Sequence, residues 1–431
     1  MRTPAVLTLA GALLIVPTSA PAHIGLQPQT VDLQHPPGAE LPLDLESLFG
    51  YFISEDAVSW RFTCHEALLG DPQNSGALLP RYVRAGDGSI LVTLSITGIG
   101  FVADESVYRS TDGGCDWATV AGLTGRSITD LTVLDDGLTV LAGSGDIGGD
   151  NGLFWSEDGG ATFVASDTTG LPGYFINVIA GGGQTAWAAS ADAVAGTATL
   201  FVTQDAGRTW SAVPFDVLIE DEVPTNLSVL AVDPIDAGHV HVRSAGQSFD
   251  YVHRTTDGGL GWELVHQDAS TVQDAVWSGA ELIAAVASLR PLVGDGATLS
   301  TDTTLPFAQG VARTPSNLYL ASNALIEDFA VARIDDGAVV PLLAFEDVTE
   351  ELVCPAGTRH ADICSQLWPD ASVVLGLFAG DDDDSTPGDD DDSTGDDDDC
   401  TCAASHAADR AAPRLWLLGA LGLGILARRR P

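Results

Sequence analysis

The chain has 431 residues, with 60 acidic residues, 18 arginines and no lysine, so its formal net charge is −42. Binding to phosphate groups needs clustered Lys or Arg, and this composition therefore argues against nucleic acid and anionic membrane surfaces as partners. The length is enough to bury a large core.

The N-terminus has the pattern of a secretory signal peptide. Arg2 precedes an apolar run at residues 5–16, and small residues at 20–22 form a cleavage site. A membrane anchor is the alternative, but the run is shorter than the roughly 20 residues that cross a bilayer. We expect cleavage after Ala22, which leaves residues 23–44 as a lead segment to the body of the protein.

Four cysteines lie in the body, at Cys64, Cys115, Cys354 and Cys364. Export favours disulfides, and four cysteines allow three pairings. We prefer Cys64–Cys115, which joins neighbouring repeats, and Cys354–Cys364, which closes a short loop. The stretch Cys64-His65-Glu66 also suggests a nucleophile, but oxidation of Cys64 is the preferred interpretation. No Cys-x-x-Cys pair is present, so zinc is not expected.

A motif of eight residues recurs four times, at 110–117, 156–163, 203–210 and 255–262. Each copy has Ser or Thr two residues before an Asp, Gly two residues after it and an aromatic residue five after it. The Asp positions are 46, 47 and 52 residues apart. The structural residues of the motif are Asp112, Gly114, Trp117, Asp158, Gly160, Phe163, Asp205, Gly207, Trp210, Asp257, Gly259 and Trp262.

The motif predicts a tight turn between two strands. Gly supplies a positive φ, and the Asp side chain accepts hydrogen bonds from backbone N–H groups of its own turn. The aromatic residue then starts the outgoing strand and packs into the seam beside the next repeat. Two worn copies extend the series, one at Ser54-Glu55-Asp56 with Trp60, the other at Ser300-Thr301-Asp302 with Phe307.

This repeat spacing suits a four-stranded propeller blade. Short β-rich runs with Gly, Asp and Pro turns fill the segments between the motifs, and no long amphipathic helix is expected there. We therefore predict an all-β propeller over residues 45–378, with about seven four-stranded blades; six or eight are also possible.

These motifs resemble the Asp-box of the BNR-repeat propellers, a group that includes sialidases, sortilin-type receptors and photosystem assembly factors. The resemblance implies the fold; for function it leaves many activities open. A sialidase would need three converging arginines, a Tyr/Glu pair and an Asp, and a Phe/Tyr-Arg-Ile-Pro motif; the stretch at 80–82 does not match that motif. Nothing in the spacing of the body arginines says that three converge: Arg61, Arg84, Arg126, Arg243 and Arg290.

Other candidate residues have plain structural interpretations. His239 and His241 alternate along a predicted strand and could form half a metal site, although exposed strand histidines are commoner. Trp187 and Trp277 are expected to fill packing between blades. Asn226 begins a glycosylation-type triplet that a bacterial envelope protein would not use. We assign no catalytic residue, no cofactor and no metal.

The C-terminal region is low in complexity. Three blocks of four Asp, at 381–384, 389–392 and 396–399, predict a disordered linker over residues 379–399, because like charges repel and the segment cannot form a core. Weak Ca²⁺ binding is the alternative, without EF-hand spacing to support it.

The last segment, 400–431, contains Cys400 and Cys402, a short hydrophobic helix at 415–427 and a terminal Arg cluster. This order resembles the MYXO-CTERM type of bacterial sorting tail. The resemblance implies transient membrane insertion, processing by a sorting protease near these cysteines and display on a Gram-negative surface, or secretion. An ordinary C-terminal anchor is the alternative.

The sequence therefore predicts an exported propeller that acts as a non-enzymatic binding or scaffold module for a protein or glycan ligand. A sialidase-like glycoside hydrolase and an assembly factor for an envelope complex stay open as alternatives.

Overall fold

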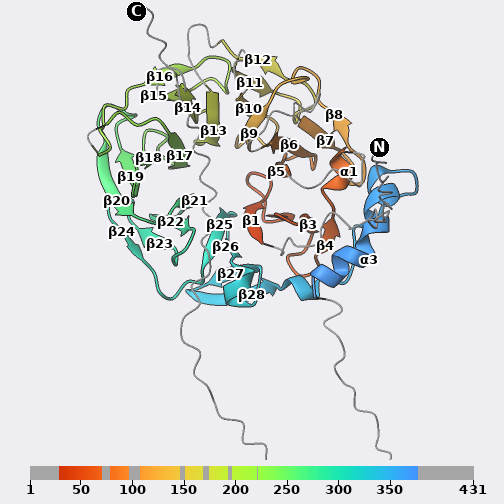
Figure 1. The fold of residues 1–431 in the computed structure, drawn as a ribbon. Coiled ribbons are helices and arrows are strands. Elements are labelled where there is room, and N and C mark those ends of the chain that lie inside the picture. The colour runs from red at the N-terminus through yellow and green to blue at the C-terminus, as the bar shows by residue number, and fades with distance from the viewer. Residues whose placement is uncertain are drawn as a thin grey trace, which may run out of the picture. The chain divides into compact units, whose positions relative to one another are not determined.

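The computed structural model describes residues 29–69, 78–96, 107–145, 151–167, 174–192, 197–220 and 222–376. They form seven four-stranded antiparallel sheets arranged as a ring (Figure 1). The predicted seven-bladed propeller is thus confirmed. The predicted signal peptide with Ala22, the Asp-rich linker and the tail with Cys400 and Cys402 lie outside the described residues.

Each blade consists of four consecutive strands, with the first strand innermost. Blades 1 and 2 contain β1 (Thr30–Gln34), β2 (Leu43–Ser47), β3 (Tyr51–Ser54), β4 (Arg61–Thr63), β5 (Leu78–Arg84), β6 (Ile90–Ile96), β7 (Val107–Ser110) and β8 (Ala118–Thr119). Blades 3 and 4 contain β9 (Ile128–Val133), β10 (Val140–Ser144), β11 (Leu153–Ser156), β12 (Val164–Ala165), β13 (Tyr174–Ala180), β14 (Ala186–Asp192), β15 (Thr197–Thr203) and β16 (Ser211–Val213).

The remaining three blades follow the same order. They contain β17 (Leu227–Val232), β18 (Val240–Ala245), β19 (Asp250–Thr255), β20 (Glu263–Asp268), β21 (Val272–Ser278), β22 (Glu281–Val286), β23 (Leu292–Gly294), β24 (Leu299–Thr301), β25 (Ala308–Arg313), β26 (Leu318–Ser322), β27 (Val331–Asp335) and β28 (Ala338–Leu343). Short helices α1 (Glu66–Leu69) and α2 (Ala324–Glu327) lie in connections.

The first blade begins earlier than the sequence predicted. Strand β1 and the start of β2 lie within residues 23–44, which were assigned to a lead segment. The worn motif at Ser54-Glu55-Asp56 follows β3, the third strand of its blade. The two inner strands of blade 1 must therefore precede it.

The core lies between the blades. Middle strands such as β10 and β26 are buried along their whole length, because each sheet packs against a neighbour on both faces. Their runs of Leu, Val and Ala accordingly lack the alternation of a one-sided sheet. Trp187 is 1% exposed and its indole donates to the carbonyl of Ala237 in blade 5, which confirms the expected role in packing between blades.

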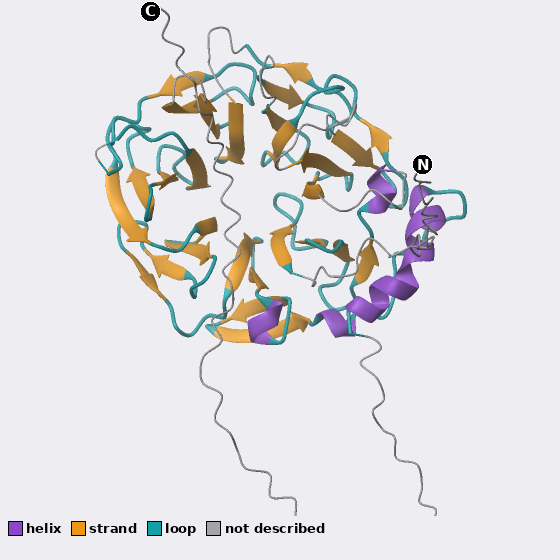
Figure 2. Ribbon diagram, in the orientation of Figure 1, coloured by secondary structure: helices purple, strands orange, loops and turns teal. Residues whose placement is uncertain are grey.

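A C-terminal segment that the sequence assigned to the propeller forms no blade. It contains a 3-10 turn η1 (Phe345–Asp347), a π-helical turn η2 (His360–Cys364) and α3 (Ser365–Val374), which lies outside blade 1 (Figure 2). Phe345 and Trp368 pack on Phe52 and Phe62 of that blade. Among the described residues, no helix is both long and apolar enough to cross a membrane.

The same segment also covers the open edge of blade 1. Phe62 in β4 donates to the carbonyl of Glu350 and accepts from the N–H of Leu352, so residues 350–352 pair in parallel with the outer strand. An unpaired outer strand would present free backbone groups to solvent. The segment therefore satisfies part of this edge.

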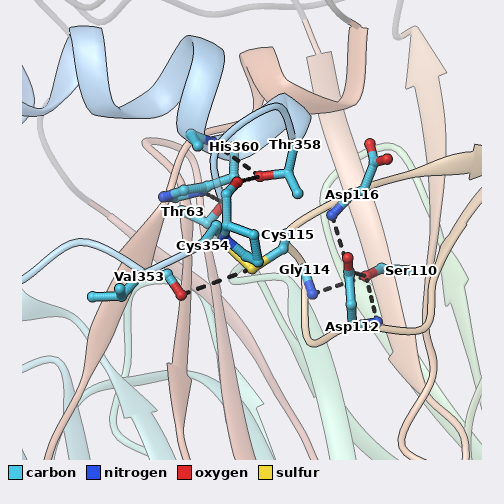
Figure 3. The surroundings of a disulfide bond; sticks show 12 residues. Thr63, Ser110, Asp112, Gly114, Cys115, Asp116, Val353, Cys354, Thr358 and His360 are labelled. Carbon is cyan, nitrogen blue, oxygen red and sulfur yellow. Dashed lines mark hydrogen bonds between the residues drawn. A yellow bond between two sulfur atoms is a disulfide. The ribbon is translucent and has the colours of Figure 1, made fainter.

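Both disulfides tie the C-terminal segment to the start of the ring. The bonds are Cys64–Cys364, with a Cα separation of 5.5 Å, and Cys115–Cys354, with a Cα separation of 5.4 Å (Figure 3). The preferred pairing of Cys64 with Cys115 and of Cys354 with Cys364 is therefore wrong. Spacing in the sequence favoured local loops, whereas the C-terminal segment returns to blades 1 and 2.

The ring closes between blade 7 and blade 1 without a shared strand. Thr30 donates its hydroxyl to the carbonyl of Ser322 at 2.5 Å. Glu40 accepts from the Thr314 hydroxyl at 2.6 Å and from the Asn317 amide at 2.9 Å. Side-chain contacts thus join blade 1 to blade 7, and the disulfide-bonded C-terminal segment is attached to blades 1 and 2.

Candidate functional site

The four strong repeat motifs lie in the turns between the third and fourth strands of blades 2 to 5. In each, the Ser or Thr hydroxyl donates to the Asp carboxylate at 2.7–2.8 Å and accepts from the Gly N–H at 2.8–3.0 Å. The carboxylate also accepts from a backbone N–H four residues on, at 2.9–3.0 Å. The Thr255 hydroxyl and the Gly261 N–H hold the pKa of Asp257 below its usual value.

The turn glycines meet two requirements, a positive φ and the absence of a side chain where the turn contacts the preceding blade. Gly160, Gly207 and Gly259 have φ between 77° and 92°, and a Cβ there would lie 2.1–2.4 Å from a side chain of the preceding blade. The aromatic residues pack in the same direction: Phe163 joins the core between blades 2 and 3, and Trp210 joins the core between blades 3 and 4. The prediction that they fill the seam with the next repeat is therefore wrong; each turn is seated on the blade before it.

One worn motif was misplaced. Asp56 lies between β3 and β4 and accepts from two backbone N–H groups of its turn, as a repeat turn requires. Asp302 follows β24, the last strand of blade 6, and makes a local bond to Thr304 instead. The turn between β23 and β24 is at Asp295, which accepts from the N–H groups of residues 297 and 298.

The seven inner strands present equivalent positions around the central channel. In blades 1, 3, 4 and 6 a register irregularity directly precedes Asp32, Asp130, Asn177 and Asp274. Such bulges re-aim side chains and are frequent beside functional sites. In blade 2 the regular strand β5 places Arg81 at the same level, opposite Thr93. Sequence analysis did not single out any of these residues.

Three of these side chains connect neighbouring blades. Asp130 accepts from the N–H of Val178 at 3.0 Å, and Asp274 accepts from the N–H of Val311 at 2.8 Å. Asn177 both donates to and accepts from the backbone of Val229. The inner strands are sheet edges with unpaired backbone groups, and these contacts satisfy some of them across the blade boundary.

Two cavities occupy the channel. The larger, of about 550 Å³, lies at the face where the inner strands begin, which we call the start face. The smaller, of about 270 Å³, lies towards the repeat turns. Both are lined by Asp32, Asp130 and Asp274, and we call this shared set the channel junction. The start-face cavity is also lined by five amide side chains: Gln29, Asn177, Asn226, Gln273 and Gln309.

The junction is electrostatically crowded. Glu46 in β2 is 2% exposed, and its Oε1 lies 4.0 Å from Arg81 Nη1, which is also 3.9 Å from Asp32. Burial raises the pKa of Glu46 to about 8, although Arg81 opposes the shift. Burial and the neighbouring Asp32 raise the pKa of Asp274 to about 7, and burial raises that of Asp130 to about 6.

These four carboxyl groups surround one guanidinium. Burial raises the pKa of Asp32 as well, and all four carboxyls in turn raise the pKa of Arg81, Glu46 most strongly. Carboxyl groups therefore outnumber guanidinium groups at the junction, and burial makes these carboxyl groups hold protons at higher pH than in solution.

The arginines considered for a sialidase do not gather in one place. Arg61 faces Glu350 at the outside of blade 1, and Arg290 packs on Phe307. Arg126 lies over the Phe154 ring, and Arg84 is buried in an ion pair with Asp44. Among the described lining residues of the start-face cavity, the arginines are Arg81 and Arg243, and no tyrosine is present. Arg243 is bound to Asp250 at 2.6 Å.

The remaining candidates have structural surroundings. His239 and His241 do share a face, with ring centroids 5.3 Å apart, but both pack on Trp277, and His241 Nε2 lies 2.8 Å from the Gly296 carbonyl oxygen. Cys64 is in a disulfide, as expected. Within the described ranges, no group of three or more His, Cys, Asp or Glu side chains is placed to hold a metal ion.

Among the comparisons with known proteins, only the one with solved structures finds matches. No family model matches the chain, and no curated protein matches it. A GH74 enzyme from Niastella koreensis is 12% identical with a TM-score of 0.45, and the match covers 72% of this chain and 54% of that one. A GH74 xyloglucanase from Xanthomonas campestris is 16% identical with a TM-score of 0.41, covering 70% and 50%.

YCF48 from Cyanidioschyzon merolae is 12% identical with a TM-score of 0.44, covering 69% of this chain and 93% of that one. The chain thus spans about half the length of the GH74 enzymes that it matches. Likenesses of this strength carry no argument about activity or ligand.

Proposed function

We propose that the chain is an exported propeller that binds a polar protein or glycan ligand at the start face and does not transform it. The observation that carries this proposal is the start-face cavity of about 550 Å³, with amide groups at its wall. Amides both donate and accept hydrogen bonds. They can therefore pair with the hydroxyl groups of a glycan or with the N–H and C=O groups of a peptide. Its two arginines are engaged with carboxylates and offer no clamp for an anionic sugar.

Export is supported by the two disulfides, because such bonds persist in oxidising compartments. The four repeat turns support membership of the Asp-box propellers, and the order of segments beyond residue 379 supports a sorting tail. Mass spectrometry of the native protein tests both ends. We expect His23 as the first residue and a C-terminus near Cys400; an intact chain recovered from the cytoplasm would contradict export.

Ligand binding is tested with immobilised glycans and a peptide library, using the full chain. Gln273→Ala at the cavity wall should abolish the strongest hit, whereas Leu260→Ala, in a repeat turn where Leu260 is 87% exposed, should leave it unchanged. Equal loss in both variants, or no loss in either, would refute a start-face site.

A glycoside hydrolase is the second candidate. One observation favours it: Glu46 and Asp274 hold their protons near neutral pH beside ionised neighbours, as a general acid must. Turnover of aryl glycosides by the wild-type protein, abolished in Glu46→Gln, would establish this candidate and overturn the first. Because Asp130 and Asp274 accept hydrogen bonds from the backbone of adjacent blades, we expect no turnover.

A further inference from the structure

The channel junction places three half-buried carboxyl groups, Asp32, Asp130 and Asp274, beside the buried carboxyl group of Glu46, which has an unfilled acceptor. Glu46 lines the start-face cavity, its side chain is 3% exposed, and its Oε2 has no hydrogen-bond partner among the described residues. A buried carboxyl oxygen without a partner carries a desolvation penalty. A donor that enters the cavity would remove that penalty.

We propose that the channel junction binds a primary ammonium group on an extended alkyl stem, supplied by a lysine side chain of a peptide or by a free polyamine. An ammonium group offers three donors and one positive charge, which suit carboxylates from different blades. This proposal rests on the proposed binding function and specifies the chemistry of its ligand.

The surroundings favour an alkylammonium over a bare metal ion. No set of three or more potential ligands in the described part of the chain is close enough together for direct metal coordination. Beyond the junction, the smaller cavity is lined by polar residues, among them Thr132, Arg84 and Arg313, and by aliphatic residues that are only half-buried: Val133, Ile179 and Val276. These aliphatic residues can lie against the methylene groups of an alkyl stem.

Arg81 is the cation already present at the junction, and it would compete with an incoming ammonium group for the carboxylates. Arg81 is 47% exposed at its side chain and stands 3.9–4.0 Å from two of the carboxyl groups, so its ion pairs are long. An incoming ammonium must share these carboxylates with Arg81. Removal of the guanidinium should therefore strengthen ammonium binding, whereas a purely structural role for Arg81 predicts no gain.

Binding should be linked to protons. The charged and titratable groups at or near the junction are Asp32, Glu46, Arg81, Asp130 and Asp274, with His35, Arg313 and the Arg84–Asp44 pair around the smaller cavity and the Arg243–Asp250 pair beside the larger. An ammonium group stabilises the ionised carboxyls, so it should release protons on binding and bind more tightly as the pH rises from 6 to 8.

Isothermal titration of the full chain in 150 mM NaCl tests the proposal, with spermidine and N-acetyl-lysine amide as separate probes. Salt at this level screens loose attraction to the acidic surface. We expect one site, heats that depend on the ionisation enthalpy of the buffer, and an affinity reduced about tenfold or more by Glu46→Gln or Asp274→Asn, since bonds to charged groups contribute about 1.5–3 kcal/mol.

Two variants complete the design. Arg81→Gln should bind more tightly, and Glu281→Gln, which removes the same charge from the exposed first residue of β22, should match the wild type. Binding of spermidine alone assigns the site to polyamines, and binding of both probes assigns it to lysine side chains as well. Equal affinity in all carboxyl variants, weaker binding by Arg81→Gln in a variant with wild-type circular dichroism, or a site that takes CaCl₂ and neither amine would overturn the proposal.

The two proposals can fail separately. If neither amine binds but a glycan or peptide still binds in a Gln273-dependent manner, the ammonium site is refuted and the binding function stands. If both tests are negative, the binding function fails as well.

Discussion

Removal of the two disulfides should be strongly non-additive. The bonds join residues 300 and 239 positions apart and are nested one inside the other. When both are present, the smallest loop that either one closes runs through the other bond. Its length is the difference of the two separations, 300 less 239, or 61 residues. Loss of one bond therefore frees only this shorter loop.

The chain-entropy relation gives magnitudes. A loop of about 61 residues corresponds to about 4 kcal/mol at 25 °C, and a loop of about 240–300 residues to about 6 kcal/mol. Replacing either cysteine pair by alanine should lower the free energy of unfolding by up to about 4 kcal/mol. Replacing both pairs should lower it by up to about 10 kcal/mol, which is more than twice the single effect.

Urea denaturation of the full chain, followed by tryptophan fluorescence, measures these differences. The variants are Cys64→Ala with Cys364→Ala, Cys115→Ala with Cys354→Ala, and the fourfold replacement. Absolute losses below these values are expected, because engineered and native bonds often deliver less than the relation predicts. A fourfold variant that loses no more than the sum of the two pairs would refute the nested-loop reasoning.

Three further predictions concern turns and titration. Gly258→Ala should lower stability by about 1 kcal/mol, because Gly258 has a positive φ although a Cβ there meets nothing within 4 Å. Gly259→Ala in the same turn should lower stability by about 1–3 kcal/mol more, because a Cβ there lies 2.1 Å from a side chain of the preceding blade. Equal losses of the two variants in urea denaturation would contradict the packing argument. Stability should fall as the pH rises from about 4 to 8, because in this range the folded state binds more protons at Glu46 and Asp274 than the unfolded state does. Glu46→Gln should make this fall less steep. A wild-type melting temperature that does not change with pH would contradict this prediction. Glu40, whose pKa the Thr314 hydroxyl lowers to about 2, should contribute stability above about pH 4.5 that is lost towards pH 2, so Glu40→Gln should lower the melting temperature at pH 7 and make no difference at pH 2.

The blade count could be predicted because it depends on a local turn. Ser/Thr, Asp and Gly at fixed offsets specify one hydrogen-bonded turn, and its recurrence counts blades. The same logic failed at Asp302, because Ser300 and Thr301 at the end of β24, followed by Asp302, imitate the start of the motif. The actual turn at Asp295 carries Val293 in place of Ser or Thr and is not recognisable by the motif.

The disulfide pairing could not be predicted, because it depends on where the C-terminal segment docks. Phe345 and Trp368 bring this segment onto blade 1, and nothing in the spacing of Cys354 and Cys364 signals that contact. The inner strand of blade 1 could have been located, since it must precede Asp56 by the length of two strands and their connections.

A signal for the channel residues is present in the sequence. Asp32, Arg81, Asp130 and Asn177 are 49, 49 and 47 residues apart, which is one blade each, and each lies within an inner strand. Aligning inner strands by blade length would have placed them at one level of the channel. Sequence analysis aligned only the outer turns and therefore missed this ring.

The channel residues serve the ring and the candidate site together. Asp130 and Asp274 hold adjacent blades through backbone N–H groups, so their carboxylates are fixed in position before any ligand arrives. Rigid placement lowers the entropic penalty of binding, because no side chain needs to be ordered. The same bonds mean that Asp274→Asn changes the junction and the boundary between blades 6 and 7 at once. Glu46 makes no hydrogen bond through Oε2 among the described residues, so Glu46→Gln leaves the backbone contacts of Asp130 and Asp274 in place.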